Sequence, residues 1–334
     1  MKALILAGGF GTRLRPLTFT RPKHMLPVAN RPHIEHVFDL LMRHGIDEVV
    51  LLTSYLAETF SDVIERASSS GMTIHTTFEQ QPLGTAGAFK NAQELVGGDA
   101  FVAFNGDILT DLDLTKVIEW HRMKGAEATI VLHAVEDPSA FGVVPTDESG
   151  RVLGFIEKPP PGEAPTNLIN AGVYVFESSV LDRIPQGEVW SAERQLFPQL
   201  VDEGAPLYAL GTDAYWMDIG TPEKYLQANL DAIARRYRLP GLSVENGEVV
   251  RSEGIEISSD ARVSSSCLGP RCTVAARAEI EDSVLLEGVR VEEGAVIRRS
   301  VLGAGVLVRP GARLVGAALA DGEVVGDGRA VREP

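Results

Sequence analysis

The chain has 334 residues, 44% of them hydrophobic, which is typical of a folded protein and long enough for two domains. Its net charge of -15, with no run rich in lysine or arginine, disfavours a general nucleic-acid binder, because such proteins usually present a basic patch. The first apolar run, at residues 3–7, is too short for the core of a signal peptide or for a membrane span. We therefore expect neither a nucleic-acid nor a membrane partner.

Short apolar runs alternate with helical patterns over the first two thirds of the chain. Residues 3–7 form the first predicted strand, and apolar residues then recur at helical spacing from Ile34 to Leu41, with Gly45 placed to cap that helix. The later elements are strands at 49–52, 100–104, 128–133, 152–156 and 171–176, and helices at 114–124, 192–201 and 222–236. This order predicts an α/β fold with a Rossmann-like, mixed but mostly parallel sheet and helices on both faces. Ligands of such sheets bind at the carboxyl ends of the strands.

The C-terminal part of the chain has a different repeat. From Ile257 to Val325 apolar residues recur every five or six positions, and four leucines lie 17 residues apart: Leu268, Leu285, Leu302 and Leu319. Three short strands per coil explain this spacing, as in a left-handed parallel β-helix of the hexapeptide type, although three full hexapeptides would give about 18 residues. We predict an α/β domain at residues 1–237, a linker at 238–250 and a β-helix domain at 251–334.

A glycine-rich loop follows the first predicted strand directly. Gly8, Gly9 and Gly11 would let backbone amides approach phosphate oxygens without a Cβ in the way. The loop is not a P-loop, because no Gly-Lys-Ser/Thr follows. It is not the dinucleotide fingerprint either, because Leu14 stands where the third glycine would be. On these residues alone, a tight surface turn is an equal alternative.

Two cations lie close to this loop in the sequence. Arg13 lies within the loop, which runs from Gly8 to Arg13, and Lys23 lies in a segment that Pro22 and Pro27 stiffen. Fixed cations beside a polyphosphate neutralise charge as a phosphate leaves. Taken singly, either residue would be an ordinary solvated charge, and the context favours phosphate binding.

A carboxylate follows another predicted strand. Asn105, Gly106 and Asp107 come directly after residues 100–104, where a side chain would face the ligand crevice. Asp107 therefore suits a Mg²⁺ ligand. The alternative is an acidic turn, because Asp111 and Asp113 follow closely.

Several motifs in order together resemble the sugar nucleotidyltransferases, the NDP-sugar pyrophosphorylases. The signature is LILAGGFGTRLRPLT followed by RPKHMLPVANRP, and the further strings are QPLGTAGA, NGD, FGVV, FIEKP, NAGVYVF and WMDIGTPEKYLQAN. The resemblance covers residues 1 to about 236, with the β-helix as a common appendage. It is greatest to the mannose-1-phosphate guanylyltransferase branch.

This resemblance implies an activity and a set of site residues. The enzyme would join a nucleoside triphosphate, GTP in this branch, to mannose 1-phosphate or another sugar 1-phosphate and release pyrophosphate, with Mg²⁺ as cofactor. Arg13, Lys23 and Asp107 would be catalytic, and Asp107 and Asp218 would hold the metal. The implied nucleotide contacts are Leu6, Ala7, Gly8, Gly9, Gly11, Thr12, Gln81, Gly84, Thr85 and Gly106. The implied sugar-phosphate contacts are Gly142, Glu157, Lys158 and Asn170.

Other activities stay open at this point. A thymidylyl- or uridylyltransferase differs only in a few base and sugar contacts. Asp111-Leu112-Asp113 fits the DxD pattern of a glycosyltransferase, although such an enzyme need not expel pyrophosphate. Acyl transfer on the β-helix is disfavoured because all seven histidines precede the tail. A sugar-nucleotide-sensing regulatory subunit would be expected to lose the cations or metal ligands that are retained.

The cysteines and the tail suggest where and in what form the protein works. Cys267 and Cys272 provide no disulfide framework, which favours the reducing cytoplasm. A β-helix has unpaired strand edges at both ends, and these need a cover. We therefore expect a homo-oligomer.

Overall fold

The structure is a computed structural model that describes residues 1–54, 56–79, 81–240, 242–244, 249–326 and 330–331. The described chain divides into two compact units. The first contains residues 1–9 and 37–216, and the second contains residues 10–36 and the described residues from 217 onward. Of the linker predicted at 238–250, residues 241 and 245–248 lie outside the described residues, and the predicted domain boundaries stay predictions.

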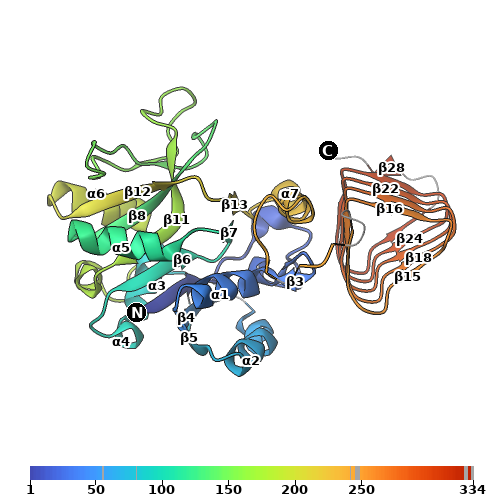
Figure 1. The fold of residues 1–334 in the computed structure, drawn as a ribbon, viewed down its shortest axis with the longest axis horizontal. Helices are drawn as coiled ribbons and strands as arrows, with labels where there is room; N and C mark the ends of the chain where they lie inside the picture. Colours follow the sequence, from blue (N-terminus) through green and yellow to red (C-terminus); the bar gives the residue numbers. More distant parts are fainter. Residues whose placement is uncertain (55, 80, 241, 245–248, 327–329, 332–334) are drawn as a thin grey trace. The chain divides into compact units, whose positions relative to one another are not determined.

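A mixed sheet forms the centre of the first unit (Figure 1). Its strands follow the order β10-β9-β11-β6-β1-β4-β5, and β8 pairs with both β11 and β12. Strands β5, β4, β1 and β6 are parallel, as are β12 and β8, whereas β11 runs antiparallel to β6 and β8. The bounds are β1 Lys2–Leu6, β4 Glu48–Thr53, β5 Thr73–Phe78, β6 Phe101–Asn105, β8 Ala128–Ala134, β9 Gly142–Val143, β10 Ile156–Glu157, β11 Leu168–Phe176 and β12 Leu207–Thr212. The predicted sheet type is confirmed.

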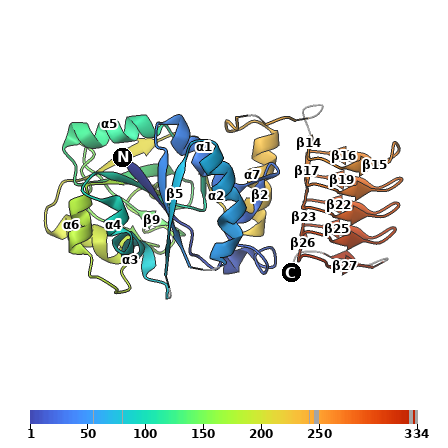
Figure 2. The same cartoon turned by 90° about the horizontal axis from the view of Figure 1, so that it is seen from below.

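Helices cover both faces of this sheet (Figure 2). On one face, α3 (Gly84–Asn91), α4 (Gln93–Val96) and α6 (Phe197–Asp202) pack on a buried cluster that includes Leu4, Ile130 and Phe89. On the other face, His121 of α5 (Leu114–Lys124) bonds to the Thr129 hydroxyl at 2.9 Å. Thr129 neighbours Ile130 in β8, so the two side chains point to opposite faces. The central strands are therefore buried on both sides, as their continuous apolar runs predict.

The predicted helix after the glycine-rich loop is confirmed, including its cap. Helix α1 spans His33–Arg43, Gly45 has φ of 71°, and the Ile46 amide donates to the Leu41 carbonyl at 3.0 Å. This is the left-handed helix end that glycine favours. Helix α2 (Ser61–Ser69), helix α3 and strands β5 and β12 are additional elements that the sequence pattern did not indicate.

Three predicted elements differ from the structure. The strand at 152–156 is wrong: Val152 forms an isolated bridge with Thr146 and only Ile156–Glu157 is a strand, because Leu153 and Ile156 are exposed and have no core to cover. The helix at 192–201 begins as a π-helix, Ala192–Leu196, because Pro198 cannot donate a backbone hydrogen bond to the preceding turn. The helix at 222–236 ends earlier: α7 spans Pro222–Ile233.

In the second unit, α7 holds the segment of residues 10–36. This segment contains two 3₁₀ turns, η1 (Thr12–Leu14) and η2 (Lys23–Met25), and the short strands β2 (Pro27–Val28) and β3 (Arg31–Pro32). The Tyr225 hydroxyl donates to the Pro27 carbonyl at 2.5 Å, and the Ala29 amide donates to Asn229 Oδ1 at 2.9 Å. Tyr225 and Asn229 are fully buried, so the segment is fixed on the helix.

The C-terminal tail is a parallel β-helix with a 17-residue coil, as predicted. Leu268 aligns with Leu285, Leu302 and Leu319 in successive strands of one sheet, and the stacked coils are seen edge-on in Figure 2. The strands of this sheet are β14 (Val249–Arg251), β17 (Ser266–Leu268), β20 (Val284–Leu285), β23 (Val301–Leu302) and β26 (Ala318–Leu319). The second sheet contains β15 (Glu256–Ile257), β18 (Thr273–Val274), β21 (Arg290–Val291), β24 (Leu307–Val308) and β27 (Val324–Val325). The third contains β16 (Arg262–Ser264), β19 (Glu279–Glu281), β22 (Val296–Arg298), β25 (Arg313–Val315) and β28 (Ala330–Val331).

A ladder of serines accompanies the leucine column. Ser266, Ser283 and Ser300 are fully buried and lie 17 residues apart. The Ser283 amide donates to Ser266 Oγ at 3.0 Å, and the Ser300 amide donates to Ser283 Oγ at 3.2 Å. The hydroxyls therefore satisfy buried amides at the point where each coil turns.

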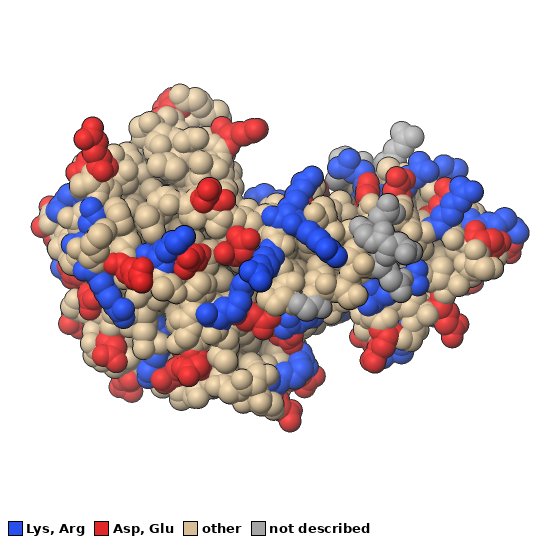
Figure 3. Space-filling model, viewed as in Figure 1, with Lys and Arg blue, Asp and Glu red and all other residues tan. Residues whose placement is uncertain are grey.

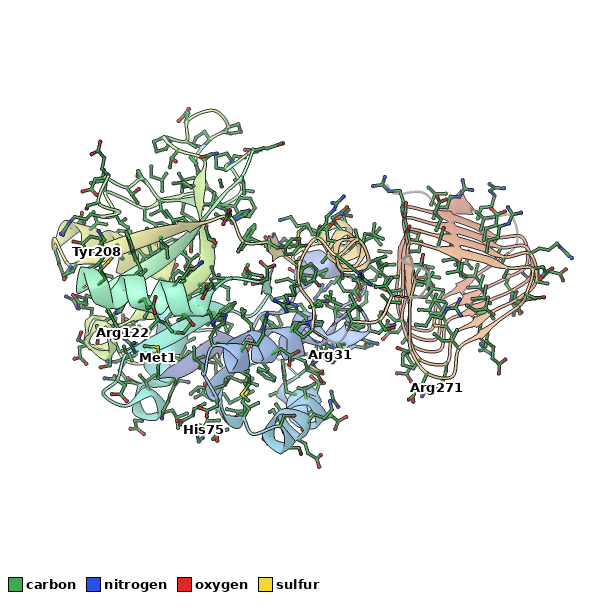
Figure 4. The ribbon with its side chains drawn as sticks, in the orientation of Figure 1. Met1, Arg31, His75, Arg122, Tyr208 and Arg271 are labelled. Carbon is green, nitrogen blue, oxygen red and sulfur yellow. The ribbon has the colours of Figure 1, made fainter. Side chains whose placement is uncertain are left out.

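The outer surface of the tail is charged. Arg271 projects outward (Figure 4) and pairs with Glu287, one coil further along. Figure 3 shows acidic and basic side chains interspersed on the visible face of each unit.

Cys267 and Cys272 are free and buried, and burial raises the pKa of the Cys267 thiol to about 12. No helix within the described part of the chain has the length and apolar character needed to cross a membrane.

We predict that Leu302→Ala lowers the free energy of unfolding of the β-helix by about 2–5 kcal/mol, because Leu302 is fully buried in the leucine column. Urea unfolding followed by circular dichroism measures this loss. Val315→Ala is the control: that side chain is 46% exposed, and we expect a change below about 0.5 kcal/mol. Equal losses in the two variants would contradict the assigned inward and outward faces.

Candidate functional site

The first part of the glycine-rich loop lies at the carboxyl ends of two neighbouring strands in the first unit. The Gly106 amide donates to the Leu6 carbonyl at 3.1 Å, and the Ala7 amide donates to the Leu52 carbonyl at 2.9 Å. The Ser54 hydroxyl donates to the Gly8 carbonyl. The structure thus brings together Leu6, Ala7, Gly8 and Gly106, and leaves Gly9 exposed. Asp107, half-buried, follows Gly106 at this edge of the sheet.

The motif around α3 needs glycine because another loop approaches its backbone closely. Gly84 has φ of 74°, and a Cβ there would lie 2.8 Å from the Trp190 carbonyl oxygen. The Gly87 amide donates to that same carbonyl at 2.9 Å, and the Trp190 amide donates to the Leu83 carbonyl at 2.8 Å. Gln81, just before α3, is exposed and available to a ligand.

Glu193 is a candidate site residue that the sequence analysis missed, because it contacts the predicted nucleotide residue Thr85. Its Oε2 accepts hydrogen bonds from the hydroxyls of Thr85 at 2.8 Å and Ser191 at 2.7 Å, and the Ala192 amide donates to Thr85 Oγ1 at 2.7 Å. Glu193 lies in the π-helix, a distortion that is frequent at functional sites. In the sequence, Ser191 and Glu193 give only the signal of a helix start, because Ser191 caps the Arg194 amide.

Two of the predicted sugar-phosphate residues are neighbours across β9 and β10. Gly142 and Glu157 face each other in the register, and a Cβ on Gly142 would lie 3.0 Å from Glu157 Oε2 and 2.6 Å from the Phe155 ring. Burial, followed by the nearby charge of Glu193, raises the pKa of Glu157 above its ordinary value. Glu193 therefore links Thr85, expected at the nucleotide, to Glu157, expected at the sugar.

Lys158 and Asn170 lie in irregular backbone. Lys158 has φ of 53°, a strained value for a non-glycine residue, and its ammonium lies 3.8 Å from Glu157. Asn170 borders a β-bulge in β11, donates to the Tyr174 hydroxyl at 2.7 Å and accepts from the Gly172 amide at 3.0 Å. Bulges of this kind re-aim side chains next to active sites.

Trp216 packs against the bulged part of β11. Its indole donates to the Ala171 carbonyl at 2.8 Å, and its ring stacks on His133 with centroids 5.4 Å apart. Phe141 contacts the same indole edge-on at 5.6 Å. Trp216 thus contacts Ala171 and Phe141, the chain neighbours of Asn170 and Gly142.

Both predicted cations, Arg13 and Lys23, belong to the second unit. A Cβ on Gly11 would be 3.4 Å from Lys23 Cβ, so the end of the glycine-rich loop folds onto the lysine. The Thr18 hydroxyl fixes this fold by donating to the Gly11 carbonyl at 2.8 Å. Thr12 is exposed in η1, next to Arg13.

Asp218 and Arg13 meet beside Gly220. A Cβ on Gly220 would lie 2.6 Å from Asp218 Oδ1 and 3.2 Å from Arg13 Nη2. Asp218 Oδ2 pairs with Lys224 Nζ at 3.2 Å, while Oδ1 is buried without a hydrogen-bond partner. A buried carboxylate oxygen that lacks a donor is a suitable ligand for a hard cation.

The residues are consistent with Mg²⁺ held largely by its substrate. Over the part of the chain that the structure describes, there is no group of three or more His, Cys, Asp or Glu side chains that could hold a metal ion. Mg²⁺ commonly uses one or two carboxylates together with water and substrate phosphates. The assignments of Asp107 and Asp218 as ligands, like the other site assignments, stay predictions.

The DxD pair has structural roles. Asp111 accepts a hydrogen bond from the Tyr215 amide at 2.9 Å. Asp113 is the N-cap of α5 and accepts from the Lys116 amide at 3.3 Å. These roles account for both aspartates and disfavour the glycosyltransferase alternative.

Comparison with known proteins shows the relationships of both parts of the chain. Residues 2–235 match the profile of the family described as "Nucleotidyl transferase", and residues 243–323 match that described as "GlmU-like, C-terminal hexapeptide". A mannose-1-phosphate guanylyltransferase of Mycobacterium tuberculosis is 39% identical over 290 residues, which cover 86% of this chain and 80% of that protein. A UTP–glucose-1-phosphate uridylyltransferase of Synechocystis is 38% identical over 322 residues, covering 86% of this chain and 83% of that protein. Among solved structures, HddC from Yersinia pseudotuberculosis complexed with GMP-PN has a TM-score of 0.59 and 30% identity, and covers 68% of this chain and 97% of that chain.

We predict that Glu193→Gln lowers the pKa of Glu157 but leaves it above the ordinary value, because the charge of Glu193 is removed while burial persists. A carbon-13 NMR titration of the Glu157 carboxyl, assigned with Glu157→Gln, measures the shift. Glu188→Gln, an exposed carboxylate on the same loop, is the matched control and should leave the titration unchanged. An unaltered Glu157 titration in Glu193→Gln would show that the two carboxylates do not interact.

Proposed function

Because the chain belongs to the nucleotidyl transferase family, we propose that it forms GDP-mannose and pyrophosphate from GTP and mannose 1-phosphate. Mannose-1-phosphate guanylyltransferases recur among its relatives, in Mycobacterium tuberculosis and in Xenopus tropicalis, the latter 40% identical over 230 residues. A guanine nucleotide analogue is bound in the related HddC structure. These relatives support the choice of base and sugar.

The observation that carries the proposal is a pair of contacts in the second unit, in which Gly11 lies against Lys23 and Arg13 lies beside Asp218. In the proposed reaction an oxygen of the sugar phosphate attacks the α-phosphorus of the triphosphate in line, and the bond to pyrophosphate breaks. The attacking oxygen is already anionic, so no general base is needed. Catalysis then depends on positioning and on stabilising negative charge. Arg13 holds the triphosphate, and Lys23 neutralises charge at the reacting phosphate.

Asp107 and Asp218 are the proposed magnesium ligands. Mg²⁺ bound by them would neutralise phosphate charge and orient the phosphates for in-line transfer. Asp218 keeps one buried oxygen without a hydrogen-bond donor, and its other oxygen pairs with Lys224 at 3.2 Å. Arg13 lies beside the same carboxylate and supplies a second positive charge to the phosphates.

The first unit supplies the proposed binding contacts for base and sugar. Gln81, Gly84 and Thr85 bind the base, and the backbone from Leu6 to Gly9 together with Gly106 borders the nucleotide. Glu157 accepts hydrogen bonds from sugar hydroxyls while Lys158 faces the sugar phosphate, with Gly142 and Asn170 completing the pocket. The strained backbone of Lys158 and the bulge beside Asn170 support a site that requires fixed geometry.

Two alternative functions are kept as candidates. The uridylyltransferase of Synechocystis is nearly as similar as the guanylyltransferase, so a uridylyl or thymidylyl specificity is the second candidate. A regulatory subunit would bind the sugar nucleotide without turnover.

We also propose that the protein is a cytoplasmic homo-oligomer, because its cysteines are reduced and buried and each sheet of the β-helix ends in edge strands.

Pyrophosphate release tests the proposed reaction. Five nucleoside triphosphates are combined with the 1-phosphates of mannose, glucose and N-acetylglucosamine in the presence of Mg²⁺. We expect kcat/KM to be at least about tenfold higher for GTP with mannose 1-phosphate than for any other pair, because base-edge hydrogen bonds discriminate strongly. A preference for UTP or dTTP with glucose 1-phosphate would refute the specificity, and binding without turnover would favour the regulatory subunit.

We predict that Asp218→Asn lowers kcat by more than about 100-fold. That figure is the upper end of the loss when a residue hydrogen-bonded to a metal ligand is removed, and removing a direct ligand should cost more. The Mg²⁺ concentration for half-maximal rate should rise as well, because the amide is a weaker ligand. Asp213→Asn, an exposed aspartate close in the sequence, serves as the control. A near-normal rate with an unchanged Mg²⁺ requirement would remove Asp218 from the metal site.

A further inference from the structure

The segment that carries Lys23 is tied to the β-helix at both of its ends. At its start, Thr20 Oγ1 and Arg21 Nη2 both donate to Asp321 Oδ2, each at 2.6 Å. At its end, Asn30 Nδ2 donates to the Leu268 carbonyl at 2.7 Å. All of these residues belong to the second unit.

The two anchors lie near opposite ends of one sheet of the β-helix. Leu268 is in β17, the second strand of that sheet, and Asp321 lies two residues after the end of β26, the last one. Three strand spacings separate them, or about 14 Å. The nine-residue step from Arg21 to Asn30 spans this distance, so the Lys23 segment runs along the stacked coils rather than touching them at one point.

Asp321 is built into the coil that holds it. Its Oδ1 accepts a hydrogen bond from the Ala304 amide, one coil earlier, at 2.7 Å. The side chains of Arg21 and Asp321 are only 25% and 21% exposed, so this ion pair is better shielded than a typical surface pair. Burial by itself would raise the pKa of Asp321, but the hydrogen bonds from Thr20 and Arg21 outweigh it and lower the pKa, which keeps the carboxylate ionised.

At the other end, the backbone adopts a conformation that needs support. Ala29 and Asn30 have φ of 49° and 65°, both in the left-handed region. The Asn30 side chain reaches the coil carbonyls, and the Ala29 amide is held by buried Asn229. Between these anchors Lys23 begins the 3₁₀ turn η2, and its Cβ lies against Gly11 of the glycine-rich loop.

We propose that the β-helix positions Lys23 for nucleotidyl transfer, with Asp321 as the positioning residue that clamps Thr20 and Arg21. The tail then takes part in catalysis through the geometry of this segment, although it supplies no group that touches the reacting atoms. This inference rests on the proposed role of Lys23 at the reacting phosphate. It makes the last coils of the β-helix a requirement for turnover in addition to any role in assembly.

The test compares the full chain with Asp321→Asn, which keeps an oxygen for the Ala304 amide but removes the charge that Arg21 and Thr20 bind. We expect kcat for pyrophosphate release to fall at least about tenfold while KM for the triphosphate changes less than about threefold, because Lys23 acts mainly in the transition state. We also expect deuterium exchange in peptides covering residues 17–32 to accelerate about tenfold, with exchange in the β-helix unchanged.

The matched control is Glu281→Gln, which removes a carboxylate paired with Arg298 at 3.3 Å on the same β-helix, away from the Lys23 segment. It should leave kcat and exchange at 17–32 as in the parent chain. Arg21→Met tests the clamp from the other side and replaces Asp321→Asn if that variant fails to fold. In the double variant the losses should not add, since both changes break one interaction.

The outcomes separate this inference from the proposed function. Normal kcat in Asp321→Asn and Arg21→Met, or unchanged exchange at residues 17–32, would overturn the positioning role. A fall in kcat matched by a lower melting temperature and faster exchange throughout the β-helix would overturn it too, because the effect would then be global instability. A parent chain without pyrophosphate release would refute the proposed function and with it the catalytic role, while the exchange data would still decide whether Asp321 anchors the segment.

Discussion

Two buried side chains of α7 hold the segment on which the proposed chemistry depends. Tyr225 donates to the Pro27 carbonyl, and Asn229 accepts from the Ala29 amide while donating to the Tyr225 carbonyl. Leaving one of these buried groups unpaired would cost about 1–3 kcal/mol. Residues 10–36 carry Gly11, Arg13 and Lys23, and they are held in the second unit by contacts with residues about 200 positions away in the sequence.

The two units carry different kinds of predicted site residue. The first places binding groups by close backbone approach, as where Gly84 meets the Trp190 carbonyl and Gly142 meets Glu157. The second places charge, with Arg13 beside Asp218 and Lys23 beside Gly11. The proposed base and sugar contacts thus lie on or beside the sheet of the first unit, whereas the proposed cations lie on a segment that α7 and the β-helix hold in the second unit.

The β-helix is suited to give that support because its coils repeat with one register. Leucine and serine ladders fix each coil to the next, and every coil therefore presents its carbonyls and its turn at a defined height. Asn30 uses the carbonyl of an early coil, and Asp321 projects from a late one. A stiff scaffold of this kind fixes two distant points of a short loop, which a single helix end would not do.

The sequence by itself determined the sheet type, the β-helix with its 17-residue coil and the family, because these follow from periodicity and from local strings such as GGFGTR. It also predicted α1 with its Gly45 cap and α5, whose signals are local. It failed at residues 152–156, where Val152 is buried but Leu153 and Ile156 are exposed, and at the π-helix, where Pro198 changes the hydrogen bonding. Only the tertiary structure decided that Glu193 joins Thr85 to Glu157 and that Asp321 clamps Arg21, because these contacts join residues 108 and 300 positions apart and no local pattern records them.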